Sequence, residues 1–119
     1  MARILVIDDE AEMLAMLQDL LTRASHEVLL ASSPGQGLAL YRTRRPDLVI
    51  TDIFIPDVDG LAVIRELHEQ VKIIAISGGG ANAQIDVLED AAGFGAWRTL
   101  AKPFRKEALL ALVAEALGP

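Results

Sequence analysis

The segment Ile4-Leu5-Val6-Ile7-Asp8-Asp9-Glu10 places four apolar residues directly before three acids. An uninterrupted apolar run of this length is typical of a strand that is covered on both faces, because a strand with one solvated face alternates apolar and polar residues. Four further apolar runs follow at similar intervals, at residues 28–31, 48–50, 73–76 and, more weakly, 97–101. The runs predict a central parallel sheet of five strands.

The segments between these runs carry apolar residues at helical spacing. Two helices are marked by full stripes, formed by Met13, Leu17, Leu20 and Ala24 and by Leu109, Leu112, Val113 and Ala116. Ser33-Pro34 starts a third helix, since serine caps a helix and proline suits its first position. Asp59-Gly60 precedes a fourth, and residues 82–92 form a fifth. Strand and helix therefore alternate, which predicts an α/β fold with right-handed crossovers and helices on both faces of the sheet.

Length and composition exclude several classes of protein. With 119 residues we expect one domain over residues 1–119. The chain has no cysteine, which excludes disulfides and thiolate metal sites, and its net charge of −6 argues against nucleic-acid binding. Its longest uncharged stretches are interrupted by Ser, Pro, Gly and Asn, and we find no signal-peptide pattern. We expect a cytoplasmic protein with no membrane partner, and we expect both His26 and His68 at its surface.

Polar residues stand at the ends of four of the five predicted strands. Asp8 and Asp9 close the first, Asp52 follows the third, Ser77 closes the fourth and Lys102 closes the fifth. Ligands of open parallel sheets bind outside the carboxyl ends of the strands. We therefore expect these five side chains to meet at one edge of the molecule.

Three carboxylates in one cleft must take up protons or bind a cation. Oxygen-only ligation suits Mg²⁺, or Mn²⁺, rather than Zn²⁺. With the ammonium of Lys102 and the hydroxyl of Ser77 nearby, a carboxylate in this cluster could take part in phosphoryl transfer. Taken singly, Asp8-Asp9 could be a helix cap with a first-turn acid, and Asp52 a turn residue. Their joint placement at strand ends favours the functional interpretation.

Four ordered motifs give the chain a family resemblance over its whole length. They are Ile4 to Glu10, Pro46 to Asp52 followed by Pro56-Asp57-Val58-Asp59-Gly60, Ile73 to Gly78, and Lys102-Pro103-Phe104. In these motifs the chain resembles the receiver domains of bacterial two-component response regulators, in particular chemotaxis-type receivers that consist of a single domain. The resemblance implies the flavodoxin-like strand order 2-1-3-4-5.

The resemblance also implies a function. Asp52 would accept a phosphoryl group from a phosphohistidine on a sensor histidine kinase or a histidine phosphotransferase. Mg²⁺ would be bound by Asp9 directly, by Asp8 chiefly through water, by Asp52 and by the main-chain carbonyl of Phe54. The signal would leave through protein contact or onward phosphotransfer.

Further roles follow from the same resemblance. Ser77 and Lys102 would hold the phosphoryl oxygens, and the Lys102–Pro103 peptide bond would be cis. The aromatic residue that commonly moves inward on phosphorylation is replaced by Thr99. Independently of the resemblance, side chains alternate along a strand over residues 97–101, so we expect Trp97 to share a face with Thr99. We predict that Trp97 reports the switch together with Ser77.

Two other functions remain as alternatives. A Mg²⁺-dependent phosphatase similar to haloacid dehalogenase-type hydrolases would need a second acid two places after its nucleophile, where this chain has Phe54. We therefore do not expect a turnover enzyme. A pseudo-receiver that only binds a partner would usually have lost the acceptor, an acid or the lysine, all of which are present.

Overall fold

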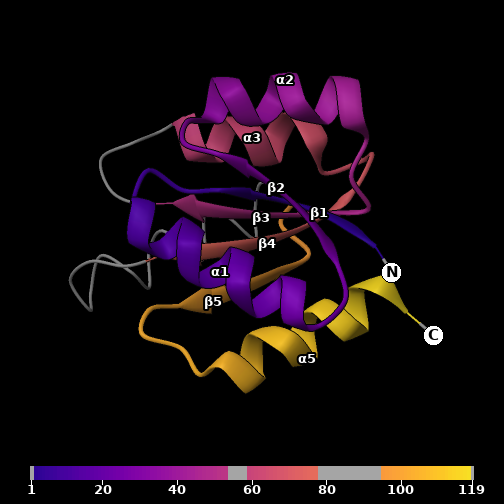
Figure 1. The fold of residues 1–119 in the computed structure, drawn as a ribbon. Coiled ribbons are helices and arrows are strands. Elements are labelled where there is room, and N and C mark those ends of the chain that lie inside the picture. Colours follow the sequence, from indigo (N-terminus) through magenta and orange to yellow (C-terminus); the bar gives the residue numbers. More distant parts are fainter. Residues whose placement is uncertain (1, 54–58, 78–94, 119) are drawn as a thin grey trace.

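The computed structural model describes residues 2–53, 59–77 and 95–118 (Figure 1). Its strands are β1 (Arg3–Ile7), β2 (Glu27–Ala31), β3 (Leu48–Ile53), β4 (Lys72–Ser77) and β5 (Arg98–Ala101). Its helices are α1 (Ala11–Arg23), α2 (Pro34–Arg44), α3 (Asp59–Leu67) and α5 (Lys106–Leu117). The helix expected over residues 82–92 and the residue Phe54 lie outside the described residues.

The five strands form one parallel sheet in the order β2-β1-β3-β4-β5. This confirms both the parallel sheet and the strand order that the family resemblance implies. The difference that bears on the site is the end of β3: the strand runs on to Ile53, so Asp52 lies within it rather than after it. The prediction ended the strand too early because Thr51 and Asp52 interrupt its apolar run, although their backbones still pair with β4.

Helices cover the sheet on both faces, α2 and α3 on one and α1 and α5 on the other (Figure 1). The alternation of side chains along β1 divides the core between them. Leu5 and Ile7 belong to the cluster beneath α2 and α3, whereas Ile4 and Val6 belong to the cluster beneath α1 and α5. Because helices exclude water from both faces of the sheet, the strands consist of uninterrupted apolar runs.

The start of α2 agrees with the sequence prediction, whereas the end of α1 does not. The hydroxyl of Ser33 accepts a hydrogen bond from the Gln36 N–H at 3.2 Å, which confirms the predicted start of α2. The helix α1 ends at Arg23, so Ala24, which the predicted stripe included, is an exposed C-cap residue. The buried residues of α1 are Leu17, which belongs to the predicted stripe, and Leu21, which does not. Met13 and Leu20 of the stripe are half-buried.

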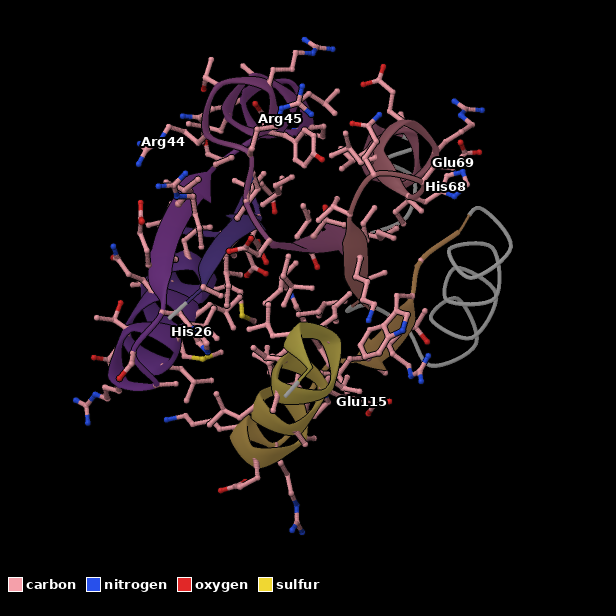
Figure 2. The ribbon with its side chains drawn as sticks, turned by 90° about the vertical axis from the view of Figure 1, so that its right-hand side faces the viewer. His26, Arg44, Arg45, His68, Glu69 and Glu115 are labelled. Carbon is pink, nitrogen blue, oxygen red and sulfur yellow. The ribbon has the colours of Figure 1, made fainter. Side chains whose placement is uncertain are left out.

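The two histidines differ in their surroundings (Figure 2). His68 is exposed, as expected. His26 is only partly exposed: its Nδ1 accepts a hydrogen bond from the Ala2 N–H at 3.3 Å, and burial lowers the pKa of its imidazole. The expectation of a surface position therefore holds only in part for His26, which lies between α1 and the edge strand β2. Among the described residues, no helix is long and apolar enough to cross a bilayer.

Candidate functional site

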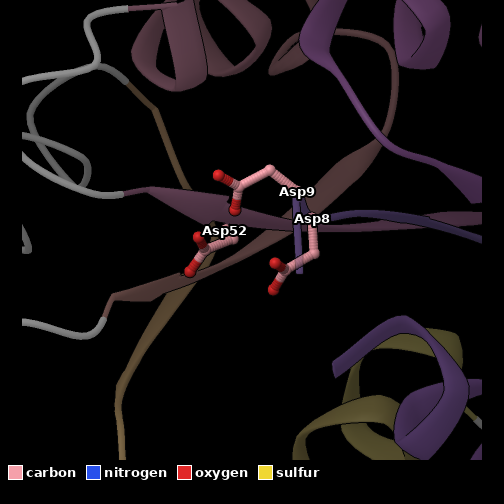
Figure 3. Close-up of side chains that lie close together, drawn as sticks. All are labelled: Asp8, Asp9 and Asp52. Carbon is pink, nitrogen blue, oxygen red and sulfur yellow. The ribbon is translucent and has the colours of Figure 1, made fainter. Parts of the chain in front are cut away.

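Three carboxylates meet at the carboxyl edge of the sheet (Figure 3). Asp8 and Asp9 directly follow β1, and Asp52 is the last residue but one of β3, the strand beside it. One oxygen from each of the three carboxylates can be chosen so that all lie within 4.8 Å of one another. The strand pairing thus brings together residues that are far apart in the sequence.

The three carboxylates differ in their contact with solvent. The side chains of Asp8 and Asp52 are 3% and 7% exposed, whereas Asp9 is exposed. A set of ligands made of carboxylate oxygens only, open to water on one side, fits a hard divalent cation such as Mg²⁺. Asp8, Asp9 and Asp52 are therefore the described residues that could hold such an ion.

Burial makes these negative charges costly. It raises the pKa of Asp52 to about 6, with the charge of Asp8 adding to the effect and Lys102 opposing it. Burial also raises the pKa of Asp8, against a hydrogen bond of 2.8 Å that the Glu10 N–H donates to its Oδ1. The cluster is thus short of positive charge, and a bound cation would relieve the repulsion.

Lys102 directly follows β5 and supplies an ammonium group to the same cluster. Its Nζ lies 3.1 Å from Asp52 Oδ1, 3.4 Å from Glu10 Oε1 and 3.5 Å from Asp8 Oδ2. Burial by itself lowers the pKa of this lysine, but the carboxylates of Asp52 and Asp8 outweigh it and raise the pKa overall. The side chain therefore carries its positive charge at neutral pH.

The backbone places Ser77 at the same edge. It is the last residue of β4 and pairs in register with Ile53 of β3 and Ala101 of β5. The peptide bond between Lys102 and Pro103 is cis, as the family resemblance implies. Four of the five strand-end residues named from the sequence are thus assembled by their side chains, and Ser77 is placed among them by its backbone.

Trp97 does not share a face with Thr99, which corrects the prediction. Thr99 pairs with Ala75, whose side chain belongs to the cluster beneath α2 and α3, whereas Trp97 packs against the cluster beneath α1 and α5. The alternation fails because β5 begins only at Arg98, and Trp97 lies in a bend before it.

Glu10 is the residue at this site whose contact the sequence did not predict. The sequence showed it only as the third acid after the first apolar run, whereas its carboxylate extends to Lys102 at 3.4 Å. Its position next to Asp8-Asp9 was the available signal, but sequence alone does not show which way a side chain at a helix start turns.

The chain is similar to known proteins both in sequence and in fold. Residues 4–114 match the sequence profile of the response regulator receiver domain. The chemotaxis protein CheY of Bacillus subtilis is 34% identical over 120 residues, which cover 98% of each chain. The sporulation initiation phosphotransferase F of the same organism is 27% identical over 105 residues, covering 86% of this chain and 82% of that protein. The crystal structure of a response regulator receiver domain protein from Clostridium thermocellum superposes with a TM-score of 0.87 at 33% identity, covering 98% of this chain and 94% of the other.

Proposed function

The chain belongs to the family of response regulator receiver domains, and we propose that its Asp52 is the phosphoryl acceptor of a two-component system or phosphorelay. Receiver domains are signalling domains with a general phosphoryl-accepting role. What is specific to the proposal is the residue that accepts the group, the metal that assists it and the donor that supplies it.

The observation that carries the proposal is the environment of the Asp52 carboxylate. It lies between two further acids that could hold a cation and an ammonium group 3.1 Å away. A negatively charged phosphoryl group would be repelled by these carboxylates alone. A bound cation and the Lys102 ammonium would neutralise its charge, so that the Asp52 carboxylate could attack its phosphorus atom.

The proposed reaction forms one bond and breaks one. An oxygen of the Asp52 carboxylate attacks the phosphorus atom in line with the bond to the donor nitrogen. That bond breaks, its electron pair stays on the nitrogen, and the donor imidazole, protonated on its other nitrogen, leaves as neutral imidazole. Asp52 becomes an aspartyl phosphate, whose oxygens the Lys102 ammonium and the Ser77 hydroxyl would hold.

A divalent ion, Mg²⁺ or Mn²⁺, would supply charge neutralisation for the phosphoryl oxygens when bound. Asp8, Asp9 and Asp52 would hold it, with the main-chain carbonyl of Phe54 as a further ligand. These carboxylates have the chemistry that the ion requires, and their grouping supports the assignment.

The proposal extends to the surroundings of the reaction. Residues 1–119 act as a single receiver domain in the cytoplasm, and the donor is a sensor histidine kinase or a histidine phosphotransferase. The protein loses its phosphoryl group slowly and is not a turnover enzyme. Ser77 and Thr99 move on phosphorylation, and Trp97 takes part in the output region on the α5 side of β5.

Intact mass spectrometry after treatment with acetyl phosphate tests the acceptor. We expect wild type to gain the mass of one phosphoryl group in the presence of Mg²⁺ and to gain none in EDTA. Asp52→Asn should remain unlabelled, while Asp19→Asn, which changes an exposed aspartate on α1, should be labelled like wild type. Labelling of Asp52→Asn to the same extent as wild type would overturn the assignment.

A further inference from the structure

Lys102 is shared between the proposed acceptor site and a carboxylate outside it. The group of acids that could hold a metal consists of Asp8, Asp9 and Asp52. Glu10 is not one of them, yet its Oε1 lies 3.4 Å from Lys102 Nζ, slightly closer than the oxygen of Asp8 at 3.5 Å. The ammonium of Lys102 donates hydrogen bonds to Asp8 and Glu10 and forms an ion pair with Asp52 at 3.1 Å, so three carboxylates share one positive charge.

The backbone of Glu10 is held in place from both sides. Its N–H donates to Asp8 Oδ1 at 2.8 Å, and its carbonyl oxygen accepts from the Leu14 N–H at 3.1 Å in the first turn of α1. Glu10 is the N-cap residue of that helix, but its side chain makes no capping hydrogen bond. The carboxylate is instead directed toward Lys102, so the contact replaces the usual work of an N-cap side chain.

A phosphoryl group on Asp52 would bring additional negative charge to the place that Lys102 faces. The ammonium would then have to turn from Glu10 toward the phosphoryl oxygens, and the Glu10 carboxylate would repel the incoming group as well. Both effects disfavour the phosphorylated state. Metal binding to the unphosphorylated site does not require Glu10, because Glu10 is not among the three acids that could hold the ion.

We propose that Glu10 is a positioning residue that competes with the phosphoryl group for the Lys102 ammonium and so weakens the phosphorylated state of the site. This inference rests on the proposed function of Asp52. Its size follows from exposure: the Glu10 side chain is 66% exposed and that of Lys102 is 16% exposed. Partly exposed ion pairs contribute little free energy. We therefore expect the contact to change the affinity of the site for a phosphoryl mimic by about two- to fivefold.

Binding of beryllofluoride tests the inference without a covalent step, since its fluorides stand for the phosphoryl oxygens. Calorimetric titration at saturating Mg²⁺ should show about two- to fivefold tighter binding in Glu10→Gln than in wild type. The matched control is Glu12→Gln, which removes an equal charge from the exposed first turn of α1 and should bind as wild type does.

The variant Glu10→Asp separates the contact with Lys102 from a general effect of charge. Aspartate keeps the negative charge but is one methylene shorter, and at an N-cap its carboxylate accepts hydrogen bonds from the helix N–H groups. We expect Glu10→Asp to bind beryllofluoride more tightly than wild type, as Glu10→Gln does. Tighter binding in Glu10→Gln alone would show a general charge effect and overturn the inference.

Equal affinities in wild type, Glu10→Gln and Glu12→Gln would also overturn it, while leaving the role of Asp52 intact. Failure of folded wild type to bind beryllofluoride with Mg²⁺ is a different result. It would overturn the proposed function and this inference with it. Asp52→Asn, which should bind no beryllofluoride, distinguishes specific binding from background.

Discussion

Lys102 and Asp52 form an ion pair of 3.1 Å although the strands that carry them are not neighbours. Lys102 follows β5, Asp52 lies in β3, and β4 runs between them. The lysine side chain therefore reaches across the carboxyl end of β4, where the backbone places Ser77. A long cationic side chain thereby links two strand ends across the position of a third.

The protonation of Asp52 should make stability depend on pH. Its pKa is raised from 3.8 to about 6 by burial and by Asp8, with Lys102 opposing. The folded chain therefore binds this proton more tightly than the unfolded chain does. The stabilisation that results is complete below pH 3.8 and is lost as the pH rises through about 6.

Asp52→Asn should accordingly gain stability relative to wild type as the pH rises through this window. In EDTA we expect an advantage of about 1–3 kcal/mol for the variant at pH about 7.5, and little advantage at pH about 4. Urea denaturation followed by circular dichroism at both pH values measures it. A difference between the two proteins that does not change with pH would show that Asp52 is not perturbed by its surroundings.

Metal binding should stabilise the folded chain through the same three acids. A cation that binds the assembled cluster and not the unfolded chain shifts unfolding by mass action. With Mg²⁺ at about ten times its dissociation constant, we expect the melting temperature to rise by about 3–6 °C. Thermal denaturation with Mg²⁺ and with EDTA measures the shift.

Asp9→Ala should lose this shift, because it removes the exposed member of the acidic group. Glu12→Ala serves as the control, since Glu12 lies one turn away on α1 and belongs to no such group among the described residues. An equal rise in Asp9→Ala and wild type would place the metal elsewhere.

Close packing of α2 on β1 should make Gly37 intolerant of a side chain. A Cβ atom built on Gly37 would lie 2.3 Å from Ile7 Cδ1, within the buried core, whereas one on Gly35 of the same helix would meet nothing within 4 Å. We expect Gly37→Ala to lower the free energy of unfolding by about 1–3 kcal/mol through overpacking.

The matched variant Gly35→Ala should be neutral or stabilise the chain by up to about 1 kcal/mol, because alanine favours the helix over glycine. Urea denaturation of both variants decides the matter. Equal stability of Gly37→Ala and Gly35→Ala would show that Ile7 can move aside without cost.

The fold could be predicted from the sequence because its decisive signals are repeated. Each strand is an apolar run, and the carboxyl ends of parallel strands meet at one edge whatever the details of the helices. This is why the placement of Asp8, Asp9 and Lys102 needed no knowledge of side-chain conformations. Asp52 was assigned to the same edge even though the end of β3 was misplaced.

Features that depend on the backbone or side-chain conformation of one residue could not be predicted. Trp97 was assigned to a face by extending the alternation of β5 by one residue, and a bend before Arg98 ends that alternation. The contact of Glu10 with Lys102 depends on the direction of an exposed side chain. Neither the bend nor that direction leaves a periodic pattern in the sequence.

The surroundings of Trp97 determine what its fluorescence can report. The guanidinium carbon of Arg98 lies 4.2 Å from the centroid of the indole, and the Nζ of Lys72 lies 5.1 Å from it. Arg98 also forms an ion pair of 3.0 Å with Glu115 on α5, and the Lys72 ammonium donates to the Ala116 carbonyl oxygen at 3.2 Å. The indole thus lies where β4, β5 and α5 meet, so we expect its fluorescence to respond to a shift of α5 against the sheet.

Phosphorylation should change the emission of Trp97 through β5. Lys102 lies at one end of this strand and Arg98 at the other, so a lysine drawn toward a phosphoryl group can shift the strand and the cation above the indole. Trp97 is the only tryptophan of the chain, and its emission therefore reports this place alone.

We expect beryllofluoride with Mg²⁺ to shift the emission in wild type and to leave the emission of Asp52→Asn unchanged. Arg98→Gln, which removes the cation nearest the indole, should reduce the shift while calorimetry shows the same binding of beryllofluoride. A wild-type spectrum that stays constant while calorimetry confirms binding would show that Trp97 is a static packing residue and that the α5 side of β5 does not respond to the site.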